Sequence, residues 1–133
     1  MTPFLRRHRE LRGSGAAAQA RQEVRGIIDE ALLAGLTVRR RDEEDALLVT
    51  CELVTNAVRH THGPCSLDLA VRHDGIDIEV TDHSPDPPRP RAPDPSGALG
   101  GYGWLLVSRL ADDLSIRPVD GDGKTVHAHI CTG

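Results

Sequence analysis

The stretch SLDLAVRHDGIDIEVTD, residues 66–82, decides the fold class of this chain. In each half of it, apolar residues alternate with mostly polar ones, which is the period of a strand with one buried and one solvated face. His73, Asp74 and Gly75 between the halves form a turn signal. The stretch therefore predicts two antiparallel strands, residues 66–72 and 75–82, joined as a hairpin.

Two amphipathic helices are expected before this hairpin. Apolar residues recur at helical spacing within residues 16–34, and Gly35 supplies a C-terminal stop signal. A second helix is expected from Asp42, as its N-cap, to about residue 60. Its apolar side is expected to carry Leu47, Cys51, Val54 and Val58, and its polar side Asp45, Glu52, Thr55, Asn56 and Arg59.

A proline-rich break follows the hairpin. Six prolines between residues 83 and 99 exclude a helix interior or a central strand there. A loop of this length inside a compact domain is typical of a functional lid, and we expect one over residues 83–100. The alternative is a polyproline segment that binds a partner module.

The rest of the chain completes an α/β (α+β) pattern. A short helix is expected over 103–111, and two strands over 114–117 and 125–130. Residues 1–15 show no periodicity and are expected to form a flexible tail. The chain length of 133 residues then predicts one domain, over residues 16–133.

Composition excludes several classes of protein. The net charge of −4 argues against nucleic acid binding, although basic residues cluster at Arg6, Arg7, Arg9 and Arg12 and at 39–41. No apolar run approaches the ~20 residues of a membrane span, and the N-terminus is not typical of a secretory signal. Three cysteines without a C-x-x-C pair support neither disulfides nor zinc, so a reducing cytoplasm is the expected setting.

Glu52 and Asn56 are the first candidates for chemistry. They lie four residues apart, so on a helix their side chains share a face. A carboxylate beside a carboxamide offers a base and a neutral oxygen, which suits a phosphate-bound Mg²⁺ that takes few protein ligands. A solvated helix face with an ordinary side-chain pair is the alternative reading.

Two further features flank the proline-rich segment. Asp82 ends an apolar strand, where its carboxylate can accept a hydrogen bond from an exocyclic amine such as that of adenine; a turn-forming Asp is the alternative. Gly97, Gly100, Gly101 and Gly103 precede a helix. Glycine lets backbone N–H groups approach an anion at a helix N-terminus, and the alternative is a hinge.

Other patterns are set aside. Residues 123–125, GKT, resemble the end of a Walker A loop, but Pro118 stands where the first glycine belongs and a strand follows. The pairs His60/His62 and His127/His129 lack a third ligand at zinc-site spacing, which favours surface histidines.

Taken in order, these elements resemble the GHKL ATPase superfamily over residues 42–130. ELVTNA, residues 52–57, looks like the family's N box, and Asp82 looks like the adenine-binding Asp of its first glycine box. GYGW, residues 101–104, is similar to its second glycine box, and KT, residues 124–125, to the segment whose Thr closes the adenine pocket. The short chain and the run DHSP, residues 82–85, resemble the anti-sigma-factor serine kinase branch.

The resemblance implies a fold and a set of roles. The fold is a two-layer sandwich of the Bergerat type, with helices on one face of a mostly antiparallel mixed sheet. The ligands are ATP and Mg²⁺: Asn56 holds the metal, Asp82 the adenine amine, and Gly101, Gly103 and Thr125 complete the nucleotide site. Glu52 acts as the general base toward a serine of a protein partner. That partner is a sigma factor or an anti-anti-sigma protein, and a homodimer is compatible with the resemblance.

The sequence departs from the family pattern beside Asp82. His83, Ser84, Pro85 and Asp86 stand where the first glycine box carries glycines, and Arg59 and Lys124 are the candidate cations for the γ-phosphate. A serine/threonine kinase is the leading hypothesis. A nucleotide-gated binding module with little turnover is the alternative, and a scaffold without nucleotide is a third.

Overall fold

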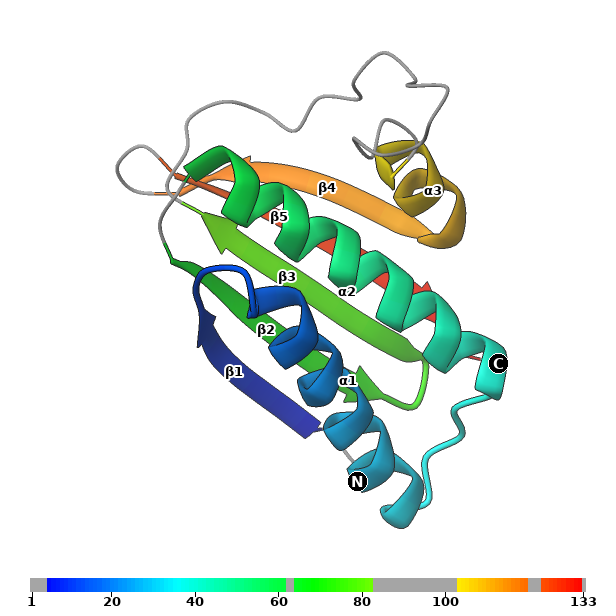
Figure 1. Cartoon of the computed structure of the whole chain (residues 1–133). Helices are drawn as coiled ribbons and strands as arrows, with labels where there is room; N and C mark the ends of the chain where they lie inside the picture. The colour runs from blue at the N-terminus through cyan, green and yellow to red at the C-terminus, as the bar shows by residue number, and fades with distance from the viewer. Residues whose placement is uncertain (1–4, 62–63, 83–102, 120–122, 133) are drawn as a thin grey trace.

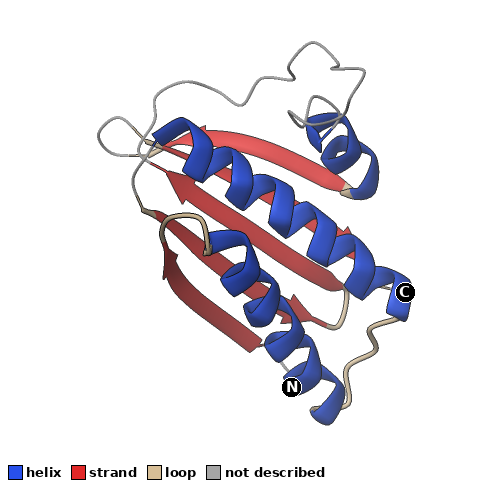
Figure 2. Cartoon of the chain, viewed as in Figure 1, coloured by secondary structure: helices blue, strands red, loops and turns tan. Residues whose placement is uncertain are grey.

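The computed structural model describes residues 5–61, 64–82, 103–119 and 123–132. In chain order the elements are β1 (Leu5–Leu11), α1 (Ala16–Leu33), α2 (Arg40–Thr61), β2 (Cys65–Arg72), β3 (Gly75–Asp82), α3 (Gly103–Leu110), β4 (Asp113–Pro118) and β5 (Lys124–Cys131). The strands form one sheet in the order β1-β2-β3-β5-β4. Figures 1 and 2 show the helices on a single face of this sheet, with α2 between α1 and α3.

The predicted two-layer α/β class is confirmed. All four strand pairs in the described part of the chain are antiparallel, so the sheet is not mixed there. The hairpin is paired as its alternation predicts, with Leu69 opposite Ile78 and Val71 opposite Ile76. These side chains are buried under the helices, while the intervening positions form an open polar face. The core is aliphatic, as the composition predicts, and each buried Leu, Ile or Val stabilises the fold by about 1.5–3 kcal/mol.

The expected tail at residues 1–15 is wrong from Leu5 onward. Leu5–Leu11 is an edge strand that pairs with β2 along its whole length. The pattern LRRHREL hides this strand because charged residues occupy both of its faces. On the helix side, Arg7 forms ion pairs with Glu23 and Glu30 of α1 instead of packing as an apolar residue.

Gly26 explains how Arg7 reaches α1. A Cβ built at Gly26 meets the Arg7 guanidinium, so the glycine leaves room for Arg7 to lie across the helix between its two glutamates. Arg9 adds a third contact, 2.9 Å from Glu23. The edge strand is therefore tied to α1 by electrostatic contacts and by the buried Leu11.

The second helix differs in detail from its prediction. It begins at Arg40, and Asp42 lies inside its first turn instead of at the N-cap. The Asp42 carboxylate reaches back to accept a hydrogen bond from the Arg39 backbone N–H at 2.9 Å, which caps the helix from the third position. Cys51, placed on the apolar side in the prediction, is only partly buried because it faces Arg21 of α1.

The buried stripe of α2 is rotated by about one position from the prediction. Of the four residues expected there, Val54 is buried and the others are only partly buried. The residues that pack on the sheet are Ala46, Val49, Leu53, Val54 and Ala57. This rotation leaves Glu52 and Asn56 partly buried at the side of the helix.

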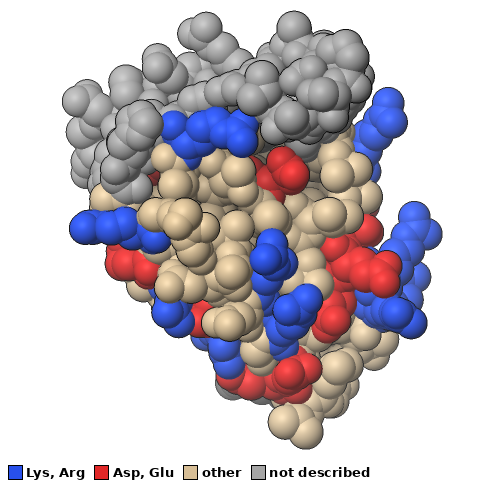
Figure 3. Space-filling model, in the orientation of Figure 1, with Lys and Arg blue, Asp and Glu red and all other residues tan. Residues whose placement is uncertain are grey.

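The outer surface shows no dominant charge on the side that Figure 3 presents. Basic and acidic side chains are interspersed over α1, α2 and the strand edge. This distribution agrees with the near-balanced charge of the sequence. Among the described helices, none has the length and apolar character to cross a membrane.

Candidate functional site

Two pairs of residues lie opposite each other where β3 ends and β5 begins. Asp82 is paired in register with Lys124, and Thr81 with Thr125. Figure 1 shows that the C-terminal half of α2 runs over this end of the sheet, in the same direction as β3. The end of the sheet and the second half of α2 therefore frame the candidate site.

Asp82 and Lys124 form a buried ion pair. The Lys124 Nζ lies 3.2 Å from Asp82 Oδ1 and 3.1 Å from Oδ2. The Asp82 side chain is only 4% exposed, and the Lys124 side chain only 8%. Both lie on the helix-covered face of the sheet, two residues along their strands from the buried pair Val80 and Val126. Asp82 is therefore a desolvated carboxylate that presents its acceptors at the end of the core.

A buried cysteine lies close to Asp82. Burial, together with the nearby Asp82 carboxylate, raises the pKa of the Cys65 thiol to about 11. A thiol in that environment stays protonated and unreactive at neutral pH. Cys65 is thus a structural neighbour of the site and not a nucleophile.

Thr125 is not brought together with Asp82. Its hydroxyl is 2.8 Å from the hydroxyl of Thr81, on the open face of the sheet. Successive residues of a strand point to opposite faces, so Lys124, and not Thr125, shares a face with Asp82. Thr125 therefore helps to fix the register of β3 and β5 from the face of the sheet opposite to Asp82. The sequence offered one missed signal, the position of Lys124 next to the expected Thr.

Glu52 and Asn56 lie on the flank of α2 that points away from α1. Cys51 marks the α1 side through its contact with Arg21, and each further residue turns 100° around the helix. Asn56 consequently lies toward the α3 side, and Glu52 lies between that flank and the outer surface. Both remain partly exposed, as residues that meet a ligand require.

Of the two predicted site glycines, only Gly103 lies within the described residues. Gly103 is the first residue of α3, so the predicted helix N-terminus exists, and α3 packs beside α2. Gly101 and the expected lid over residues 83–100 lie outside the described residues. Lys124, a candidate for the γ-phosphate, is instead paired with Asp82. Arg59 stays a candidate on the last turns of α2.

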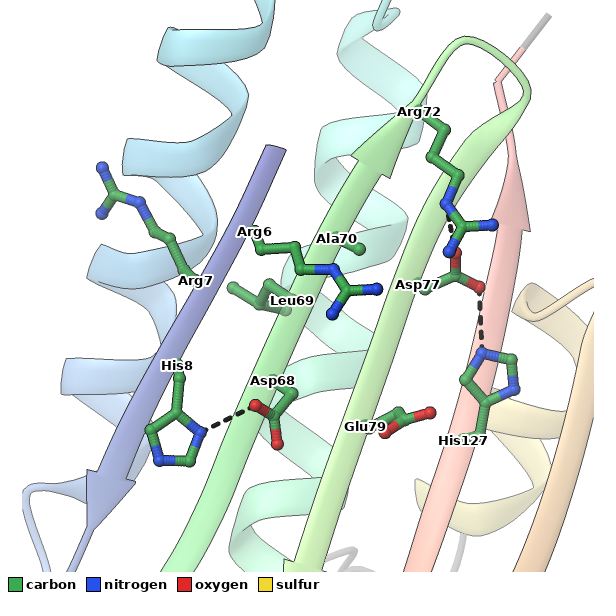
Figure 4. A pocket seen from close by; sticks show the side chains of 10 residues that line it. All are labelled: Arg6, Arg7, His8, Asp68, Leu69, Ala70, Arg72, Asp77, Glu79 and His127. Carbon is green, nitrogen blue, oxygen red and sulfur yellow. Dashed lines mark hydrogen bonds and ion pairs between the residues drawn. The ribbon is translucent and has the colours of Figure 1, made fainter. Parts of the chain in front are cut away.

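A hollow lies on the opposite side of the sheet. It measures about 700 Å³, and Figure 4 shows its charged lining, with Arg6, Arg72, Asp68 and Glu79 on neighbouring strands. This hollow does not contain Asp82, Glu52 or Asn56. The buried Asp82 side chain points to the other, helix-covered face of the sheet.

The open face carries a small titratable cluster. Asp77 Oδ1 accepts hydrogen bonds from His127 Nε2 at 2.9 Å and His129 Nδ1 at 2.8 Å. Burial alone raises the pKa of Asp77, but the bonds from the two histidines outweigh it and hold this pKa below its ordinary value of 3.8. Within the described ranges, no group of three His, Cys, Asp or Glu side chains is arranged to hold a metal ion.

Replacing Asp77 with Asn is expected to lower stability at neutral pH and not in acid. A depressed carboxyl pKa contributes stability above the unfolded-state pKa, and that contribution is lost as the pH falls through the folded-state value. Urea unfolding should show the variant less stable by about 1 kcal/mol at pH 7, with the difference vanishing at an acidic pH below the folded-state pKa of Asp77. A difference that stays constant between these two pH values would contradict this assignment.

Three comparisons identify the class of protein. A family model described as histidine kinase-like ATPase domain matches residues 11–130. The chain is 30% identical over 110 residues to an anti-sigma F factor from Pasteuria penetrans, covering 73% of each protein. It also matches a crystal structure of the RsbU and RsbW domains of Rv1364c from Mycobacterium tuberculosis with a TM-score of 0.69 and 19% identity. That match covers 99% of this chain and 33% of the larger one. At this sequence identity, it shows a shared fold only.

The chain belongs to the histidine kinase-like ATPase family. Within that family, the similarity to an anti-sigma F factor places it in the anti-sigma-factor kinase branch, as the motifs of the sequence predict. The family relationship implies ATP as the nucleotide.

Proposed function

We propose that this protein is an ATP-dependent serine/threonine kinase that transfers the γ-phosphate to a serine of a protein partner. The observation that carries the proposal is the buried Asp82 carboxylate at the end of the sheet, on the face that α2 covers with Glu52 and Asn56. A buried carboxylate keeps acceptor sites beyond its pairing with Lys124, so it is able to select an exocyclic amine over an oxygen, which would place acceptor against acceptor. Such a site fits adenine.

The residues of α2 fit the phosphate end of the nucleotide. The Asn56 carboxamide oxygen would hold Mg²⁺, which prefers oxygen ligands and few of them from protein. Glu52, one helical turn away, would accept the proton of the partner's serine hydroxyl. The serine oxygen then bonds to the γ-phosphorus as the bond to the ADP oxygen breaks, a reaction that needs mainly positioning and charge neutralisation.

The partner follows from the branch of the family. The similar protein from Pasteuria penetrans is named an anti-sigma F factor. We therefore propose a sigma factor as the bound partner and an anti-anti-sigma protein as the phosphorylated one, which implies a cytoplasmic setting. In this proposal, ATP consumption controls which of the two partners is held.

A binding module with little turnover is the second candidate function. The run His83, Ser84, Pro85 and Asp86 in place of glycines favours it, because glycine lets the backbone approach a nucleotide most closely. In that case ATP would select the partner-binding state without being consumed.

Transfer from labelled ATP separates the two functions. The purified protein is incubated with γ-labelled ATP, Mg²⁺ and candidate anti-anti-sigma proteins from the same genome. A labelled partner serine supports the kinase. ATP that binds and stays intact in the presence of every partner supports the module. Absence of ATP binding contradicts both and favours a scaffold.

A further inference from the structure

Lys124 is the only lysine of the chain; the remaining basic residues are arginines. This lysine is buried at the end of the sheet with its ammonium against both oxygens of Asp82. The arginines with described ion pairs bridge strands to α1, lie at or just before the start of α2, or lie on the open face of the sheet. The one ammonium group is thus beside the carboxylate that the proposed function assigns to adenine.

Lysine and arginine act differently at such a carboxylate. A guanidinium is a rigid planar fork that holds a carboxylate through two fixed bonds. An ammonium is a compact charge with three donors that rotate, so it can pair with a carboxylate and also turn a donor toward a ligand. Asp82 with Lys124 therefore presents an acceptor and a donor side by side, about 3 Å apart.

The edge of adenine has the complementary arrangement. Its 6-amino group donates, and its ring nitrogen N1, directly beside it, accepts. We propose that Lys124 is a base-reading residue that donates a hydrogen bond to adenine N1 while Asp82 accepts one from the 6-amino group. The inference rests on the proposed ATP site and adds a second specificity residue to it.

The same pair rejects guanine in that orientation. Guanine carries an oxygen at position 6 and an N–H at position 1, so its acceptor would face the carboxylate and its donor would face the ammonium. Both contacts are repulsive. A donor beside an acceptor discriminates better than a carboxylate alone, because the wrong base then meets two repulsive contacts in a buried place instead of one.

The surroundings hold the pair in place. The hydroxyl bond between Thr81 and Thr125 ties the two strands together one residue away, on the other face. A Cβ built at Gly123 lies 2.4 Å from the Asp82 carbonyl oxygen, so the backbone before Lys124 packs directly on that of Asp82. The donor and acceptor are therefore fixed by the sheet before a ligand arrives, which lowers the ordering cost of binding.

Base analogues test the inference on the unmodified protein. ATP, 1-deaza-ATP, which lacks the N1 acceptor, and purine riboside triphosphate, which lacks the 6-amino group, are titrated by calorimetry in Mg²⁺. Each analogue is expected to bind about 10- to 100-fold more weakly than ATP, the loss of one hydrogen bond to a charged group. Equal binding of ATP and 1-deaza-ATP overturns the role of Lys124 and leaves the proposed function standing. No ATP binding overturns both.

The single lysine also gives a direct signal. In protein labelled with ¹³C-lysine, one side-chain Cε resonance is expected, and ATP should shift it more than 1-deaza-ATP does. The variant Lys124→Met should bind ATP more weakly and make no distinction between ATP and 1-deaza-ATP. Arg117→Met, which removes an ion pair with Glu79 on the open face, should behave as the unmodified protein. Tighter ATP binding by Lys124→Met would show that Lys124 masks Asp82, and would overturn the inference.

Discussion

Replacing Glu52 with Gln is expected to lower phosphoryl transfer to a partner serine by about 10²- to 10⁴-fold, the usual contribution of a general base. The amide has nearly the shape of the carboxylate but does not accept the serine proton. Because the proposed role of Glu52 concerns the serine proton and not the nucleotide, ATP affinity should change little. The rate is measured in single turnover with γ-labelled ATP and saturating partner.

Glu44→Gln is the matched control for this variant. Glu44 lies on the same helix, pairs with Arg40 and is 60% exposed at its side chain. It should retain the full rate. A Glu52→Gln variant that transfers phosphate as fast as the unmodified protein would contradict the general-base role and leave the ATP site unaffected.

Replacing Asp82 with Ala is expected to abolish measurable ATP binding and to destabilise the fold. Removal of one member of a buried pair leaves the other as an uncompensated charge, at a cost of about 3–5 kcal/mol. Lys124, at 8% side-chain exposure, has little access to water as a substitute partner. Calorimetric titration measures the first effect, and urea unfolding measures the second.

Two further variants separate binding from folding. The double variant Asp82→Ala/Lys124→Met removes both charges, so it should recover part of the stability and none of the ATP binding. Glu79→Ala breaks the exposed pair with Arg117 on the other face and should cost less than about 1 kcal/mol. Asp82→Ala protein that is folded and still prefers ATP over GTP would contradict the adenine assignment.

The hairpin and its helices were predictable because their burial follows a simple period. Ile76, Ile78 and Val80 alternate with polar residues, and the structure buries them. The first strand was not predictable by that rule, because Arg7 takes a position that an apolar residue normally fills and is satisfied by ion pairs with α1. Such a contact depends on residues 16 to 23 positions away, which local pattern does not contain.

The sequence identifies the helices and strands that carry the candidate site residues, but not the side of the sheet to which each strand residue points. Glu52, Asn56 and Asp82 all lie on described elements at one side of the sheet, as their motifs indicate. Thr125 was predicted only as part of the nucleotide site; in the structure the next residue toward the chain start, Lys124, is the one that shares a face with Asp82, because successive strand residues point to opposite faces. Which residue of β5 lies opposite Asp82 depends on the register in which β3 pairs with β5.

Titration of ATP with and without Mg²⁺, on the unmodified protein and on Asn56→Ala, tests the central claim most directly. Thr55→Ala is the control, because Thr55 immediately precedes Asn56 on the same helix but lines a separate hollow toward α1. The account predicts that the unmodified protein and Thr55→Ala bind ATP more tightly in Mg²⁺, and that Asn56→Ala loses this gain. Asn56→Ala protein that keeps the full Mg²⁺-dependent gain, or an unmodified protein that binds no ATP at millimolar concentration, would contradict it.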